Sequence, residues 1–101
     1  MQFLKSTQSL QKMQLTNELF NKENKNFTIR KGIRDYVLGN CILVNDETNE
    51  EINITITEIQ YCKLNEINKF VNEDFIEYKK VLDKFYEIEL NDDVTIVKYV
   101  K

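Results

Sequence analysis

The clearest pattern in this chain is the alternation of apolar and polar residues at 52–59, INITITEI. Three isoleucines fall on one side of a strand and Asn53, Thr55 and Thr57 on the other, because successive side chains of a strand point to opposite faces. The apolar run 40–45, NCILVN, precedes it, and the Asn and Asp residues between the two segments favour a turn. Together the segments predict a β-hairpin.

Short apolar or alternating runs predict three more strands, at 27–30, 86–90 and 94–100. In the first of these, FTIR, Phe27 and Ile29 share one face while Thr28 and Arg30 share the other. The last two strands are separated by a turn rich in Asn and Asp.

Apolar residues at helical spacing predict three helices, at 5–21, 64–71 and 74–86. The first would make its apolar contacts through Leu10, Met13, Leu19 and Phe20. In the last, Asp74 and Glu77 have the spacing of a capping box. The positions of this helix expected in the core include Phe75, Tyr78, Phe85 and Tyr86.

The predicted elements indicate the α+β class, with residues 1–101 as a single domain. About five short strands around one core favour a small barrel or a strongly curled sheet packed by helices. An apolar fraction of 42% with only two glycines and no proline is typical of a chain that folds.

Charge and residue types exclude several function classes. The net charge of −3 argues against a protein that binds long nucleic acid through a broadly basic surface. The segment 22–35 nevertheless contains five basic and two acidic side chains. This local excess of positive charge suits a small polar or anionic ligand. The chain has no histidine, so His-dependent triads are excluded and a zinc site is not expected.

Two further features concern the compartment. Cys41 and Cys62 have apolar or aromatic neighbours and no paired spacing, so we expect buried free thiols in a reducing environment. No apolar run approaches the length of about 20 residues that a membrane-spanning helix needs. We therefore expect a cytoplasmic protein without a membrane partner.

The stretch KNFTIRKGIRDYVLGNCILV, residues 25–44, resembles the signature of ASCH domains, which are PUA-related β-barrels. Lys25, Thr28 and Arg30 match the K-x-x-T-x-R motif of that family, and Gly39 matches its turn before an apolar strand. The resemblance extends over roughly residues 20 to 100. It departs from the family where FNKENK replaces a segment that usually carries a glycine, and where Glu73 begins Glu-Asp-Phe instead of Glu-Gly-Phe.

The resemblance implies a small PUA-like β-barrel of about five to six strands packed by two to three helices. Small members of the family are amidohydrolases acting on N4-acetylcytidine, with lysine, threonine and glutamate as the catalytic set. Carried over, that set is Lys25, Thr28 and Glu73, with Asp74 as the alternative acid. Other members are thought to bind RNA.

The chemistry of these residue types agrees with such a site. A threonine hydroxyl needs an adjacent base to act as a nucleophile, and a lysine serves if burial lowers its pKa. Lys25 would activate Thr28 or hold the acyl oxygen, and Arg30 offers a planar fork to a carbonyl or an anion. Glu73 would protonate the departing amine, although a helix N-terminus favours its charged form.

Two more residues are candidates for substrate binding, each with a simpler interpretation. Arg34 is either a ligand contact or a surface charge, and Tyr36 is either a stacking platform for a base or a core residue.

Three functions remain open on the sequence. The first is hydrolysis of an N-acyl amide on a modified pyrimidine nucleoside. The alternatives are a non-catalytic PUA-like module that binds RNA or a modified nucleobase, and a small protein-interaction domain. The expected partner is a nucleoside or RNA, without an extended DNA duplex, and no metal or organic cofactor is expected. The substrate, the acyl group and the oligomeric state are not determined by the sequence.

Overall fold

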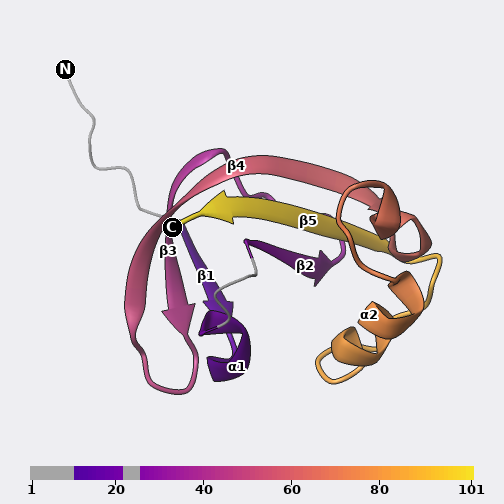
Figure 1. Ribbon diagram of the computed structural model, residues 1–101, viewed down its shortest axis with the longest axis horizontal. Coiled ribbons are helices and arrows are strands. Elements are labelled where there is room, and N and C mark those ends of the chain that lie inside the picture. Colours follow the sequence, from indigo (N-terminus) through magenta and orange to yellow (C-terminus); the bar gives the residue numbers. More distant parts are fainter. Residues whose placement is uncertain (1–10, 22–25) are drawn as a thin grey trace.

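The computed structural model describes residues 11–21 and 26–101, and within them the chain forms one five-stranded mixed sheet that curls into a half-barrel (Figure 1). The strand order is β1-β3-β4-β5-β2. Among the strand pairs of the described residues, only β1–β3 is parallel. The strands are β1 (Gln11–Leu15), β2 (Phe27–Lys31), β3 (Gly39–Asn45), β4 (Glu51–Lys63) and β5 (Asp93–Val100).

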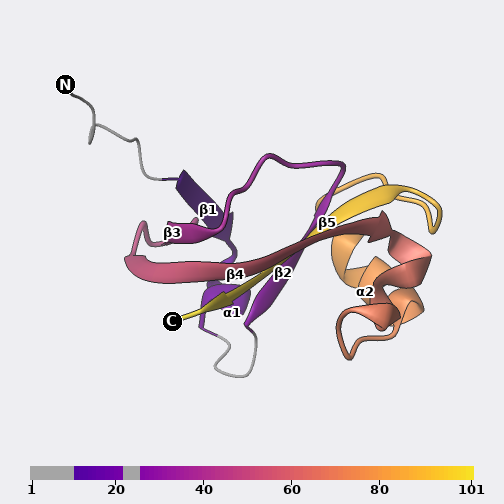
Figure 2. The ribbon, with the colours of Figure 1, turned by 90° about the horizontal axis from the view of Figure 1, so that it is seen from above.

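Strand β4 runs the length of the sheet and joins its two halves (Figure 2). Its first residues pair with β3 and its later residues with β5. The register with β5 shifts between Ile56 and Glu58, which is the irregularity expected where a strand bends. The curl of the sheet thus arises within a single long strand.

Three short helices complete the described fold: α1 (Asn17–Phe20), the 3-10 helix η2 (Leu64–Lys69) and α2 (Phe75–Leu82). Helices η2 and α2 pack together at one end of the sheet, and α1 follows β1 near the other end (Figure 1). Among residues 11–21 and 26–101, no helix is long and apolar enough to cross a membrane.

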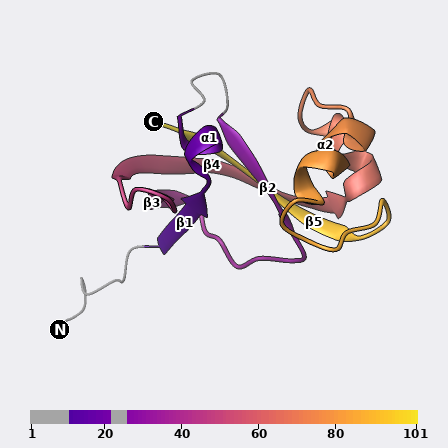
Figure 3. The ribbon, with the colours of Figure 1, turned by 90° about the horizontal axis from the view of Figure 1, so that it is seen from below.

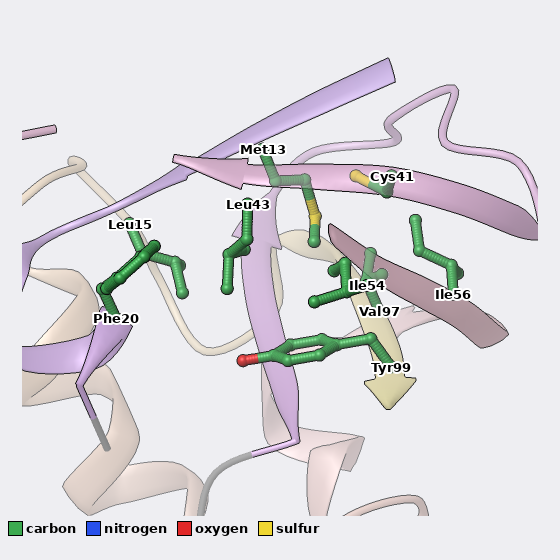
Figure 4. Close-up of a cluster of buried hydrophobic side chains, with 9 residues drawn as sticks. All are labelled: Met13, Leu15, Phe20, Cys41, Leu43, Ile54, Ile56, Val97 and Tyr99. Carbon is green, nitrogen blue, oxygen red and sulfur yellow. The ribbon is translucent and has the colours of Figure 1, made fainter. Parts of the chain in front are cut away.

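The core has two clusters. Side chains from β1, β3, β4, β5 and α1 point toward one another in the first (Figure 4), which comprises Met13, Leu15, Phe20, Cys41, Leu43, Ile54, Ile56, Val97 and Tyr99. The second lies between the sheet and the helices η2 and α2, and comprises Ile29, Leu64, Ile67, Val71, Tyr78, Leu82, Ile88, Val94 and Ile96. Strand β5 contributes to both clusters from its two faces, with Val94 and Ile96 in the second and Val97 and Tyr99 in the first.

Several predictions from the pattern are confirmed. Strands β3 and β4 form the predicted hairpin, with Ile54 and Ile56 buried and Thr55 and Thr57 exposed. Strands β2 and β5 lie where they were predicted, within a residue. The α+β class is confirmed in its broad form, a curled sheet packed by helices.

The helix predicted over 5–21 is wrong where the structure describes it. Residues Gln11–Leu15 form β1, and a helix of only four residues follows it. Met13 and Leu15 are buried while Lys12 and Gln14 are exposed, so the true period is two. Parallel pairing with β3, a long-range partner, selects the strand. Residues 5–10 lie outside the described residues.

The predicted strand at 86–90 is also wrong. The segment runs as an irregular connection, although Ile88 is buried and Leu90 packs against the second cluster. Both edges of β5 are already paired, with β4 and β2, so this segment cannot form a hairpin ladder with the strand that follows it. The preceding helix ends at Leu82, which leaves Phe85 51% exposed instead of in the core.

Candidate functional site

Strand β2 places the two residues of the motif that the structure describes. Phe27 and Ile29 pack with the second cluster, as the alternation predicts. Thr28 is 5% exposed, and Arg30 is partly buried on the same side of the strand. In the described sheet β2 pairs with β5 alone, so it is an edge strand.

A cavity of about 180 Å³ lies beside this edge strand, and we call it the edge cavity. Its walls come from the end of β1, from β2, from the turn after β3 and from α2 with the turn that follows it. The lining residues are 14–16, 28–30, Asp46, Tyr78, Val81, Leu82, Phe85 and Tyr86. Thr28 and Arg30, which the alternation places on one face of the strand, therefore border one cavity.

Arg30 spans the opening between the two edge strands. Its Nη2 donates a hydrogen bond of 2.6 Å to the backbone carbonyl of Gln14 on β1. Its Nε is buried and has no hydrogen-bond partner. A buried donor without a partner costs roughly 1–3 kcal/mol, so Arg30 keeps this position at an energetic cost.

Tyr78 of α2 is another residue of the cavity wall. The residue is 6% exposed, and its ring lies 6.3 Å from that of Phe27 between centroids. Burial, assisted by the Glu73 carboxylate, raises the pKa of Tyr78 to about 12, against the opposing charge of Arg30. The hydroxyl consequently keeps its proton at neutral pH and can donate a hydrogen bond.

Glu73 lies close to this cavity without lining it. It borders a separate open depression of about 530 Å³, together with Asn26, Phe27, Phe70 and Lys98 among others. Its charge still acts on Tyr78. Neighbouring Asp74 caps α2, because its carboxylate accepts from the backbone N–H of Ile76 at 2.8 Å. Of the two candidate acids, Asp74 is thus engaged in a structural role.

The other predicted site residues lie elsewhere. Arg34 is in the loop between β2 and β3, where its Nε donates to the carbonyl of Lys31 at 2.7 Å. Tyr36 is partly buried against the first cluster, which agrees with its interpretation as a packing residue. Neither borders the edge cavity. Lys25 lies outside the described residues.

Sequence reasoning missed the contribution of Tyr78 and of the β1 residues to the cavity. Tyr78 was expected only as a core residue, and it does pack in the second cluster. A buried tyrosine usually directs its hydroxyl to a polar partner, which was the available signal. Gln14 reaches Arg30 and the cavity because residues 11–15 form a strand. The local sequence pattern had predicted a helix there, so it gave no indication of this contact.

The described residues offer little to metal or thiol chemistry. No group of three or more Cys, Asp and Glu side chains within 11–21 and 26–101 is arranged to hold a metal ion. Both cysteines are free, as predicted, but only Cys41 is buried and Cys62 is partly exposed. Burial raises the pKa of the Cys41 and Cys62 thiols, so neither is activated as a thiolate.

Comparisons with protein-family models, curated proteins and solved structures found no match to this chain.

Proposed function

We propose that this chain is an ASCH-type hydrolase with a PUA-like fold, which removes an acyl group from a modified pyrimidine nucleoside such as N4-acetylcytidine. The observation that carries the proposal is the meeting of Thr28 and Arg30, two residues of one motif, in the edge cavity. Sites for drug-sized ligands measure about 300–1,000 Å³. A cavity of about 180 Å³ therefore suits one ring or acyl group, with the sugar outside.

The proposed chemistry assigns one role to each residue. The Thr28 hydroxyl attacks the acyl carbon, and Arg30 donates to the acyl oxygen as negative charge develops there. The bond from the acyl carbon to N4 then breaks, and the amine leaves with a proton from an acid, for which Glu73 is the candidate. Water hydrolyses the resulting ester. Lys25 is assigned as the base for Thr28 on the sequence motif.

One observation favours a second candidate, a module that binds the modified base without reacting. Glu73 borders the neighbouring depression and not the cavity that holds Thr28. A general acid must come within hydrogen-bonding reach of the leaving nitrogen, although such contacts tighten when substrate binds. If Glu73 does not approach, the cavity would recognise its ligand and leave it intact.

The test is hydrolysis of N4-acetylcytidine, followed by chromatography of the released cytidine, alongside calorimetric binding. Wild type is compared with Lys25→Ala and Thr28→Val, and with Thr55→Val as a matched control on the exposed face of β4. We expect Thr28→Val and Lys25→Ala to lose at least about a hundredfold in kcat/KM, and the control to keep wild-type activity.

The outcomes separate the two candidates. Binding without turnover by folded wild-type protein would reject the hydrolase and leave the binding module. Turnover that survives both substitutions would reject this site. Neither binding nor turnover would reject both candidates.

A further inference from the structure

Arg30 is a partly buried cation that forms no ion pair with an acidic side chain of the described residues. Its hydrogen bond goes to the backbone carbonyl of Gln14, which carries no net charge. Burial raises the pKa of Tyr78 and Tyr99, and the uncompensated charge of Arg30 opposes that rise. A charge held partly out of water without a counter-ion is unfavourable, so a bound anion would relieve that cost.

The donors that this part of β2 offers can be assigned atom by atom. Arg30 Nε is buried and is not accessible to a ligand. Arg30 Nη1 and the Thr28 hydroxyl make no hydrogen bond within the described part of the chain, yet both atoms keep some accessible surface. Both residues border the edge cavity from the same face of β2. One wall of the cavity therefore offers a cationic N–H donor and a hydroxyl donor.

The wall contributed by α2 and the turn after it is mostly apolar. In Figure 3, β2 lies between α1 and α2, and Val81, Leu82 and Phe85 border the cavity from the α2 side. Such surroundings strengthen a charge-assisted hydrogen bond, and they pack against an alkyl group better than against an inorganic ion. The exposed Asp46 also borders the cavity, and its negative charge opposes an anion. The walls thus suit a carboxylate that carries a short alkyl group.

The size of the cavity points to a ligand of only a few non-hydrogen atoms. Its volume is about 180 Å³, whereas one water takes up about 30 Å³ in the liquid. The planar guanidinium group matches the geometry of a carboxylate. We infer that the edge cavity binds a small carboxylate such as acetate, with Arg30 and Thr28 as its donors.

The same site would receive the product of the proposed reaction. Hydrolysis adds one water to the ester on Thr28, which restores the hydroxyl and releases a carboxylate and one proton. Because this carboxylate forms beside Arg30, it occupies the site and competes with the next substrate molecule. The binding of a carboxylate stands on the cavity alone, whereas product inhibition rests on the proposed function.

The test is an NMR titration of ¹⁵N-labelled protein with sodium acetate at constant ionic strength, with chloride as the balancing salt. The titration extends into the millimolar range, because a ligand with so few atoms binds weakly. The amide signals of Thr28 and Arg30 report binding. Acetamide is the neutral control ligand, and we expect it to bind at least about tenfold more weakly than acetate, because it lacks the charge.

Three variants separate the charge of Arg30 from its packing. Arg30→Met keeps most of the apolar stem and should weaken acetate binding at least about tenfold. Arg34→Met is the matched control, because Arg34 is also partly buried but does not border the edge cavity; its acetate affinity should equal that of wild type. Asp46→Asn removes the opposing charge and should tighten binding about twofold or more. Circular dichroism of each variant verifies the fold, and Arg30→Lys replaces Arg30→Met if the latter does not fold.

The outcomes distinguish this inference from the proposed function. Acetate binding that Arg30→Met loses and Arg34→Met keeps supports the carboxylate site, whether or not N4-acetylcytidine is hydrolysed. Hydrolysis by wild type that acetate inhibits competitively supports the product role. Hydrolysis without acetate binding overturns the inference and leaves the proposed function standing. Equal binding of acetate and acetamide, or tighter binding of inorganic phosphate than of acetate, overturns the inference as well.

Discussion

Replacing Thr95 by valine tests how the loop between β2 and β3 is held. Thr95 lies in β5 and is fully buried. Its hydroxyl accepts from the N–H of Arg34 at 2.9 Å and donates to the carbonyl of Gly32 at 2.7 Å. Valine keeps nearly the same shape, so the substitution removes two hydrogen bonds without opening a cavity.

The expected magnitude follows from those two bonds. A typical internal hydrogen bond contributes about 1 kcal/mol net, so Thr95→Val should lower the free energy of unfolding by about 2 kcal/mol. Leaving both partners buried and unpaired would cost more, but the loop can open and expose them to water. For a domain of this size the melting temperature should fall by about 8–12 °C.

The assay is urea unfolding followed by circular dichroism, with exchange of the Arg34 amide measured in parallel. Thr55→Val is the matched control, because Thr55 is an exposed strand threonine and its replacement should change stability by less than about 0.5 kcal/mol. Arg34 should exchange faster in the Thr95 variant only. If both variants are equally stable, the hydroxyl of Thr95 does not hold the loop.

Three further predictions concern the helix, the pH response and the core. Asp74→Ala should cost about 1 kcal/mol in urea unfolding because the N-cap is lost, whereas Asp74→Asn should retain most of it. Tyr78 has a pKa of about 12 in the folded protein, whereas a tyrosine in the unfolded chain loses its proton near pH 10. The free energy of unfolding should therefore fall by up to about 2–3 kcal/mol as the pH rises between these values. The fall should be less steep in Tyr78→Phe. Leu43→Ala, at a fully buried position of the first cluster, should cost about 2–5 kcal/mol by the same assay; a loss below about 1 kcal/mol would contradict the packing.

The elements predicted well are those whose pattern is independent of distant partners. The period of two in β4 is strong enough to identify both faces of the strand. Asp74 marks the start of α2, because its side chain accepts hydrogen bonds from backbone N–H groups of the first helical turn. Residues 11–15 are different, because two apolar positions in five residues are too few to establish a period. Pairing with β3 decides their structure.

The candidate site likewise has features that the local pattern predicted and features that depend on packing. Alternation alone predicted that Thr28 and Arg30 share a face, and the structure brings both to one cavity. It places Glu73 in a neighbouring depression and Arg34 in the loop after β2. These placements depend on how α2 and the loop pack on the sheet, which no local pattern encodes.

The sequence by itself determined the strands of the hairpin, the facing of side chains on β2 and the residue types available for chemistry. These follow from steric and periodic properties of the chain over a few residues. Only the tertiary structure decided that β2 would be an edge strand with Arg30 reaching toward β1. Strand order is set by contacts between segments far apart in sequence, and that order places β2, beside which the cavity lies, at an edge of the described sheet.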